Sequence, residues 1–461
     1  MSAAAVSISN DSPEPWKLSA VAAIQLMEAG ELSPVELVQS LLDRIDAVDA
    51  DIKSWVTVDG DRALNAARTT ADAIANGLPL GLLAGLPVGL KDVFLTAGLR
   101  TTASSKALAD FVPTEDAIAV TKLRDAGAIV LGKVHTAEFA CADPAPTRNP
   151  WNAEHTPGGS SSGSAAAVAA GTVPVTLGTQ TGGSTLRPAA YNGIVGLKPS
   201  YGLISNRGVI PLAWSFDHVG ILARSVADAS LVVHALAGYD RNDPASCAEA
   251  DNFEPPELSG ASAPVIGLVS SHFMETCEPD MFEHVHEIAA KFEAEGAQVR
   301  EVSLPASFSR IAATFSAIAW SETAAYHQQQ FAERGEMYGP KIAAIIEQGK
   351  REMASDYVRA LRERPGIVAD LETTFSGVDI LLTPATPSPP PRNTSHTGDA
   401  SFQIPWAYAG VPSVSLPSGV NRWGLPLGVQ LVGRRWRDAH LLESAQWCEQ
   451  VLGFSAHPPC W

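Results

Sequence analysis

The hydrophobic positions in the first part of the chain recur at the spacing of amphipathic helices. They predict two helices within residues 18–48 and a third, rich in alanine, at residues 63–75. Ser19 precedes the first helix, and Ser33-Pro34 begins the second. A serine there accepts a hydrogen bond from a free N–H group of the first turn, and proline fits the first helical position. We therefore expect a helical segment before the first strand.

Farther along, short apolar runs alternate with helical patterns, while residues 209–219 and 242–264 have the character of loops. The expected strands are residues 86–93, 128–131, 173–177, 264–269, 298–302, 378–382, 410–417 and 426–432. The expected helices are residues 116–126, 225–236, 279–295, most of 311–364, and 439–451. Alternating strands and helices indicate a layered α/β core, as one large domain or two smaller ones.

Composition and charge narrow the function classes. Hydrophobic residues make up 46% of the 461 positions and charged residues 18%, as in a globular protein. The net charge of −18 argues against nucleic acid or an anionic membrane as a partner. The five cysteines form no CxxC pair, which argues against a zinc site and a disulfide framework and indicates a reducing compartment.

The sequence carries no sign of secretion or membrane insertion. Its N-terminal residues lack the basic segment and the apolar segment of a signal peptide. No apolar run reaches the length needed to span a bilayer. We therefore expect a soluble, cytoplasmic protein.

One stretch, residues 156–198, is much richer in glycine and serine than the rest of the chain. It contains two Gly-Gly-Ser turns, at residues 158–160 and 182–184. Glycine tolerates a positive φ and lets backbone N–H groups approach a ligand, so such turns form anion-binding concavities. A serine at the end of such a turn is well placed to act as a nucleophile beside its own oxyanion hole.

Two other interpretations do not make the final serine of either Gly-Gly-Ser turn the nucleophile. Ser161 fits the letters of a Gly-x-Ser-x-Gly elbow, with His218 and Asp217 as its nearest candidate partners, although no strand precedes it. Alternatively, both turns only shape a loop or bind a phosphate.

The third interpretation joins both turns to Lys91, which forms a charge pair with Asp92 at the end of an apolar run. Such a lysine either extends to solvent from a strand end or lies buried with a lowered pKa and serves as a base. In the second case Ser184 attacks a carbonyl and Ser160 relays its proton to Lys91. The backbone N–H groups that would hold the oxyanion, with that of Ser184 itself, belong to Thr181, Gly182 and Gly183.

The ordered motifs resemble the amidase signature family of serine hydrolases. The matching pieces are residues 89–92, 157–164, 178–184, 193–199, 379–384, 410–412 and 424–433. They cover nearly the whole chain. The resemblance implies a single amidase domain at residues 1–461 with a large mixed β-sheet sandwiched between α-helices. Residues 242–377, where the resemblance is weakest, are expected to form a more variable, largely helical region.

The resemblance also implies a Ser–Ser–Lys triad and no metal or cofactor. The family's nucleophile falls on Ser184, its lysine on Lys91, and its bridging serine, held in a non-proline cis peptide, on Ser160.

The chain departs from the family pattern near this site. The three differences are Gln180 where Asp is common, Arg187 directly before Pro188 instead of two residues before it, and His135 in place of a frequent Asn. They leave the triad intact and prevent the transfer of a substrate from any one family member.

We therefore expect an amidohydrolase that cleaves a linear carboxamide, anilide or carbamate (urethane) bond through an acyl-enzyme. Residues 141–148, 320–331 and 402–408 are expected to line the pocket, and the aromatic residues of the last two segments suggest that it is apolar. The expected partner is a small-molecule amide or carbamate, without nucleic acid or membrane, and the expected state is a monomer or homodimer. Two alternatives stay open: the amidase subunit of a tRNA-dependent amidotransferase, and a non-catalytic binding protein on the same fold.

Overall fold

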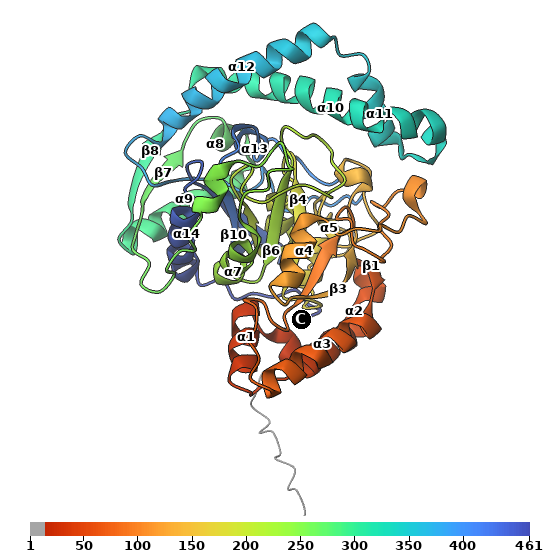
Figure 1. Ribbon diagram of the computed structural model, residues 1–461. Coiled ribbons are helices and arrows are strands. Elements are labelled where there is room, and N and C mark those ends of the chain that lie inside the picture. Colours follow the sequence, from red (N-terminus) through yellow and green to blue (C-terminus); the bar gives the residue numbers. More distant parts are fainter. Residues whose placement is uncertain (1–13) are drawn as a thin grey trace, which may run out of the picture.

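The protein is described from a computed structural model that covers residues 14–461 (Figure 1). The expectation that the chain carries no signal peptide depends largely on residues 1–13, which lie outside the described residues. None of the helices in the described part is long and apolar enough to cross a membrane.

A mixed sheet of eleven strands forms the centre of the molecule, in the order β1-β3-β2-β4-β6-β5-β10-β11-β9-β7-β8. Strand β2 runs parallel to β3 and β4, and β7 runs parallel to β8 and β9. The other pairs are antiparallel. The strands are β1 Trp55–Val58, β2 Pro87–Lys91, β3 Ile129–Val134, β4 Val175–Gln180, β5 Val195–Lys198, β6 His218–Ala223, β7 Val265–Val269, β8 Gln298–Val302, β9 Ile380–Pro384, β10 Ser413–Val420 and β11 Pro426–Val432.

Helices cover both faces of this sheet, which confirms the predicted α/β sandwich. Helices α2, α3, α5 and α6 share one buried apolar cluster with the sheet, and α4, α7, α9 and α14 share another. The helices are α1 Ala20–Glu28, α2 Pro34–Ile52, α3 Gly60–Ala75, α4 Ile118–Asp125, α5 Ser162–Ala169, α6 Leu186–Asn192, α7 Val226–Leu236, α8 Phe273–Thr276, α9 Pro279–Ala294, α10 Ile311–Arg334, α11 Pro340–Gly349, α12 Ala354–Glu372, α13 Ile404–Ala409 and α14 Asp438–Leu452.

The first two helices begin where the sequence predicts. The Ser19 side chain accepts a hydrogen bond from the N–H of Ala22 at the start of α1. At α2, Ser33 and Glu36 form a capping box: the side chain of each residue accepts a hydrogen bond from the backbone N–H of the other. Local sequence alone therefore fixes where these helices start.

Residues 209–219 are only partly the expected loop. His218 and Val219 begin β6, because they pair with Gln180 and Thr179 at the end of β4. This pairing places the loop before β6 directly beside the second Gly-Gly-Ser turn.

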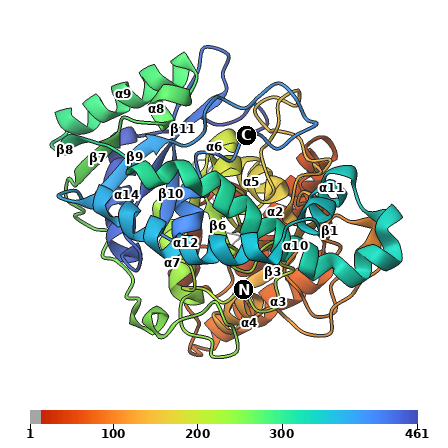
Figure 2. The same cartoon turned by 90° about the horizontal axis from the view of Figure 1, so that it is seen from above.

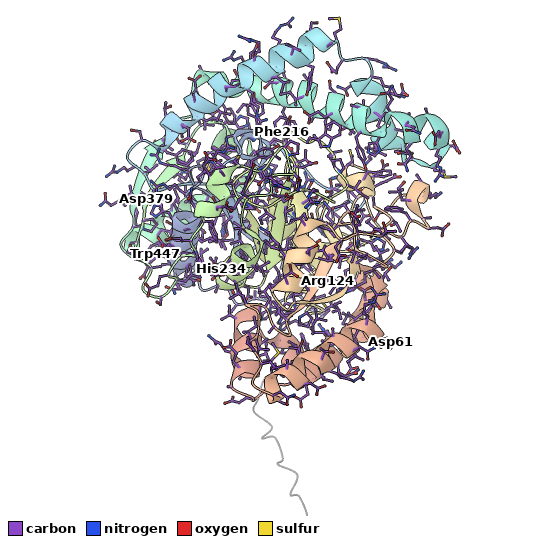
Figure 3. All side chains as sticks on the ribbon, in the orientation of Figure 1. Asp61, Arg124, Phe216, His234, Asp379 and Trp447 are labelled. Carbon is purple, nitrogen blue, oxygen red and sulfur yellow. The ribbon has the colours of Figure 1, made fainter. Side chains whose placement is uncertain are left out.

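Helices α10, α11 and α12 arch over one end of the sheet (Figures 1 and 2). The apolar sides of α10 and α12 form a third buried cluster with α13 and with the loop before β6. Phe216, labelled beneath the arch in Figure 3, packs on Phe315 of α10 with ring centroids 4.7 Å apart. The arch therefore rests on the loop that borders the candidate site.

Candidate active site

The candidate site lies at the carboxyl ends of two parallel strands, β2 and β4. Lys91 is the last residue of β2, and Thr179 lies next to the end of β4. Because the strands are parallel, their carboxyl ends lie at the same edge of the sheet, where ligands commonly bind in α/β proteins. The Lys91 ammonium nitrogen lies 2.8 Å from Ser160 Oγ and donates to Thr179 Oγ1 at 2.6 Å.

Lys91 is completely buried, so the solvent-exposed interpretation is wrong. Its hydrogen-bond partners among the described residues are two hydroxyl groups, and neither neutralises a positive charge. Burial therefore lowers the pKa of Lys91 well below its ordinary value, while the negative charge of Asp217 acts in the opposite direction. A neutral amine in this place can accept a proton.

The Lys91-Asp92 pair of the sequence is not a pair in space. Asp92 lies 3.5 Å from the ammonium group of Lys133 and accepts hydrogen bonds from the backbone and hydroxyl of Thr102. Lys91 is the last residue of β2 and Asp92 begins the turn after it, so the two side chains reach different partners.

Ser160 ends the first Gly-Gly-Ser turn, which Arg187 holds in place. The Gly159–Ser160 peptide bond is cis. The carbonyl of Gly159 accepts from the buried guanidinium of Arg187 at 2.6 Å, and the same guanidinium donates to the Gly398 carbonyl at 3.0 Å. Arg187 therefore fastens the first Gly-Gly-Ser turn to a distant loop, a role that its changed position in the motif did not reveal.

The second Gly-Gly-Ser turn lies against the first. The backbone N–H of Ser161 donates to the carbonyl of Ser184 at 3.2 Å. Ser184 retains 8% of its surface exposed, whereas Ser160 and Lys91 have none. Within the described part of the chain, the N–H groups of Gly182, Gly183 and Ser184 donate to no protein acceptor. The turn thus presents free donors around the most accessible of the three candidate catalytic side chains.

Gln180 shows how the chain accommodates a departure from the family pattern. Its side-chain carbonyl accepts from the N–H groups of Thr185 and Leu186 at 2.9 and 3.0 Å. These groups begin the helix α6 that follows Ser184, so the amide of Gln180 caps this helix without a carboxylate.

The elbow interpretation fails on geometry. Ser161 Oγ donates to the carbonyl of Thr179 at 3.2 Å, and His218 Nδ1 lies 2.5 Å from the carbonyl of Phe216. Asp217 accepts from Thr181, Leu212 and Ala213 and has no hydrogen bond to His218. These side chains therefore form no Ser–His–Asp relay.

A cleft of about 800 Å³ opens next to the site. Asp217 lines this cleft and accepts a hydrogen bond from Thr181, which directly precedes the second Gly-Gly-Ser turn. Trp214, Tyr326 and Phe111 form its aromatic wall. Of the three segments expected to supply a pocket, the one at residues 320–331 contributes to this cleft. Across residues 14–461, no group of three or more acidic, histidine or cysteine side chains is arranged to hold a metal ion.

Comparison with known proteins fixes the family. A model of the family described as Amidase matches residues 36–442. The chain belongs to the amidase signature family. Its enzymes act on amide C–N bonds, so the broad prediction of an amide-cleaving enzyme is confirmed.

Three similar proteins illustrate the range of the family. The A subunit of a glutamyl-tRNA(Gln) amidotransferase from Geobacter sp. (strain M21) is 39% identical, over 91% of this chain and 94% of the relative. The structure of a peptide amidase from Stenotrophomonas maltophilia has a TM-score of 0.85 at 31% identity, covering 97% of this chain and 99% of that one. The structure of the glutamyl-tRNA(Gln) amidotransferase A subunit from Thermotoga maritima has a TM-score of 0.78 at 30% identity, covering 94% of both chains.

The prediction about partners is wrong. Relatives named for glutamyl-tRNA(Gln) and for a subunit conflict with a small-molecule substrate, with the exclusion of nucleic acid, and with a monomer or homodimer. The net charge of −18 describes this chain alone, so it does not exclude other subunits or a nucleic acid as partners. None of the relatives named above is a carbamate hydrolase, so the carbamate remains a prediction.

Proposed function

We propose that this chain cleaves an amide by acyl transfer to Ser184. Ser184 Oγ attacks the carbonyl carbon while its proton passes through Ser160 to the neutral amine of Lys91. The N–H groups of Gly182 and Gly183, with that of Ser184, stabilise the oxyanion. When the C–N bond breaks, Lys91 returns the proton through Ser160 to the leaving nitrogen, and water then attacks the acyl-enzyme and releases the acid with Ser184 restored.

One observation carries this proposal: Lys91 is buried, free of an ion-pair partner within residues 14–461, and 2.8 Å from Ser160. A serine hydroxyl becomes a nucleophile when a base removes its proton, and a lysine can do so only while it is neutral. A purely binding protein on this fold would have no need for a neutral amine beside the hydroxyls of Ser160 and Thr179.

The relatives support an assignment within this chemistry, the amidase subunit of a tRNA-dependent amidotransferase. In that role the chain would release ammonia from the side-chain amide of glutamine and would work with other subunits on a glutamyl-tRNA. The support is the 39% identity to such a protein over 91% of this chain.

A second candidate is an amidase that acts on a carboxamide other than glutamine, an anilide or a carbamate. Two observations favour it. The structural match to the peptide amidase, with a TM-score of 0.85, is higher than the match to the Thermotoga protein, at 0.78. The aromatic wall of Trp214, Tyr326 and Phe111 also provides a surface for an apolar group.

Hydrolysis by the purified chain tests the chemistry and separates the candidates. Wild type, Ser184→Ala and Ser162→Ala are assayed against glutamine, aliphatic amides, anilides and aryl carbamates, with released amine or ammonia quantified. Ser162 is the matched control, because it is buried in the same segment and its Oγ has no hydrogen-bond partner within the described residues. Turnover by wild type and Ser162→Ala, and its loss in Ser184→Ala, is the expected result.

The outcome pattern assigns the function. Ammonia release confined to glutamine, and stimulated by co-expressed partner subunits and tRNA, supports the amidotransferase role. Efficient cleavage of other amides supports the second candidate. Full activity in Ser184→Ala would refute the proposed nucleophile in either case.

A further inference from the structure

A buried carboxylate outside the proposed triad holds the second Gly-Gly-Ser turn. Thr181 directly follows β4 and Asp217 directly precedes β6, and the register that pairs Gln180 with His218 brings them opposite each other. The hydroxyl of Thr181 donates to Asp217 Oδ1. Thr181 is followed at once by Gly182, Gly183 and Ser184.

The other oxygen of this carboxylate is also fully engaged. Asp217 Oδ2 accepts from the N–H groups of Leu212 and Ala213 at 2.8 and 3.0 Å. Asp217 therefore closes the loop of residues 212–217 on itself and leaves one oxygen for Thr181. With 7% of its surface exposed, the carboxylate is well shielded from competing water.

The same loop is fastened to the arch of helices. Glu322 of α10 accepts from the backbone and hydroxyl of Ser215 at 2.9 and 2.5 Å. Thr323 of α10 donates to the carbonyl of Leu212 at 2.9 Å. A continuous set of hydrogen bonds thus runs from α10, through the loop and Asp217, to the turn that carries Ser184.

We infer that Asp217 is a positioning residue, which acts through the Thr181 hydroxyl to fix the oxyanion-binding N–H groups beside Ser184. This inference rests on the proposed function. The turn is rich in glycine and lies outside helix and strand, so its backbone has few restraints of its own. Catalytic donors must be held close to their productive geometry, and a displacement of about 1 Å can cost roughly 100-fold in rate.

Asp217 also interacts electrostatically with Lys91 of the site and with Glu322 of α10. Its negative charge raises the pKa of Lys91, against the larger effect of burial, and Glu322 acts on it from α10. Burial raises the pKa of Asp217 itself to about 6. Loss of the carboxylate charge therefore lowers the pKa of Lys91 further. This gives a signature in the pH profile that a merely structural residue would not produce.

The Thr181 hydroxyl provides the first test, since Thr181→Val removes the hydrogen bond but keeps the shape and all charges. With the amide that wild type cleaves best, we expect kcat to fall by roughly 10- to 100-fold with a much smaller change in KM. Thr181→Ser, which restores the hydroxyl, should recover most of the rate. Wild-type kcat in Thr181→Val would overturn the inference.

Asp217→Asn provides the second test, and Asp228→Asn is its control. Asp228 is also a buried carboxylate, but it accepts from Val21 at the opposite end of the fold. We expect Asp217→Asn to lower kcat and to move the acid limb of the pH–rate profile to lower pH, with no such movement in Asp228→Asn. Equal limbs in Asp217→Asn and wild type would contradict the inference.

Both tests remain decisive if one variant fails. Should Asp217→Asn not fold, as judged by thermal unfolding, the Thr181→Val and Thr181→Ser pair decides alone. Should no amide be cleaved, the labelling rate of Ser184 by a fluorophosphonate probe replaces kcat, because the probe requires the same activated serine and oxyanion donors. Labelling of wild type that Thr181→Val does not slow refutes the role of Asp217. Absence of labelling in wild type refutes the proposed function instead.

Discussion

Replacement of Lys91 by arginine shows whether Lys91 acts as a base or only as a structural cation. Arginine keeps a positive charge and hydrogen-bond donors, but its guanidinium stays protonated at every working pH and cannot accept the proton of Ser184. General-base catalysis contributes about 10²–10⁴-fold to a rate, or roughly 3–5 kcal/mol of activation free energy. We therefore expect Lys91→Arg to lose at least about 100-fold in kcat/KM, as much as Lys91→Met.

The burial of Lys91 makes a second, thermodynamic prediction. In the unfolded chain this lysine is protonated up to about pH 10.5, whereas burial lowers its pKa in the folded protein. Between the two pKa values the unfolded state binds the extra proton, so folding releases it and stability rises with pH. Lys91→Met has no proton to release. The free energy of unfolding of wild type relative to Lys91→Met should therefore rise by about 1.4 kcal/mol per pH unit in this interval.

Urea unfolding of both proteins between pH 6 and pH 9, combined with a pH–rate profile of wild type, measures these effects. The rate should fall as the pH is lowered through the pKa of Lys91, because the charged amine cannot act as a base. The reasoning would be refuted by Lys91→Arg activity within tenfold of wild type, or by a stability difference that does not change with pH.

Two further substitutions test how the turns are held. Gly183→Ala places a Cβ 2.5 Å from the buried Oε1 of Gln403, so we expect a loss of about 1–3 kcal/mol in urea unfolding together with loss of turnover. Gly366→Ala in α12 has no neighbouring atom within 4 Å and should be neutral or slightly stabilising, and equal behaviour of the two variants would refute the steric argument. Arg187→Lys should cost roughly 3 kcal/mol of stability and lower turnover, because an ammonium cannot bond the carbonyls of Gly159 and Gly398 together as the guanidinium does. Wild-type stability and turnover in this variant would count against the fastening role.

Sequence patterns predicted the long elements well and missed the short, buried ones. Helices such as α2 carry an apolar stripe and a capping box, and both signals are local. Strand β5 has four residues, all buried, and lies within the glycine- and serine-rich stretch, so it shows no alternation of apolar and polar positions. Helix α6 has seven buried residues and a proline, and it is positioned by Gln180 and the sheet more than by its own pattern. Such elements are fixed by tertiary contacts that a single sequence does not display.

The candidate site was predictable only in part, because its motifs are visible in the sequence and its tertiary contacts are not. The Gly-Gly-Ser turns and Lys91 belong to long ordered motifs, so sequence was enough to name them. Two contacts of the site depend on strand pairing and register, which determine which residues of neighbouring strands lie side by side. They are the contact of Lys91 with Thr179 and the contact of Thr181 with Asp217. The sequence indicates Asp217 only as a member of a different triad, because its adjacency to His218 is visible there and its position opposite Thr181 across β4 and β6 is not.

The contrast between two buried lysines shows what makes one of them suited to serve as a base. Lys133 lies on β3, beside β2, and is as buried as Lys91. It has Asp92 at 3.5 Å, and burial lowers its pKa to about 8 against the opposing charge of that carboxylate. Lys91 bonds two hydroxyls instead, and burial lowers its pKa well below its ordinary value. Asp92, in the turn directly after β2, pairs with Lys133 and not with its sequence neighbour. This contact neutralises a structural cation and leaves the amine beneath Ser160 without an ion-pair partner. A chain that exchanged these contacts would gain stability at Lys91 and lose its base.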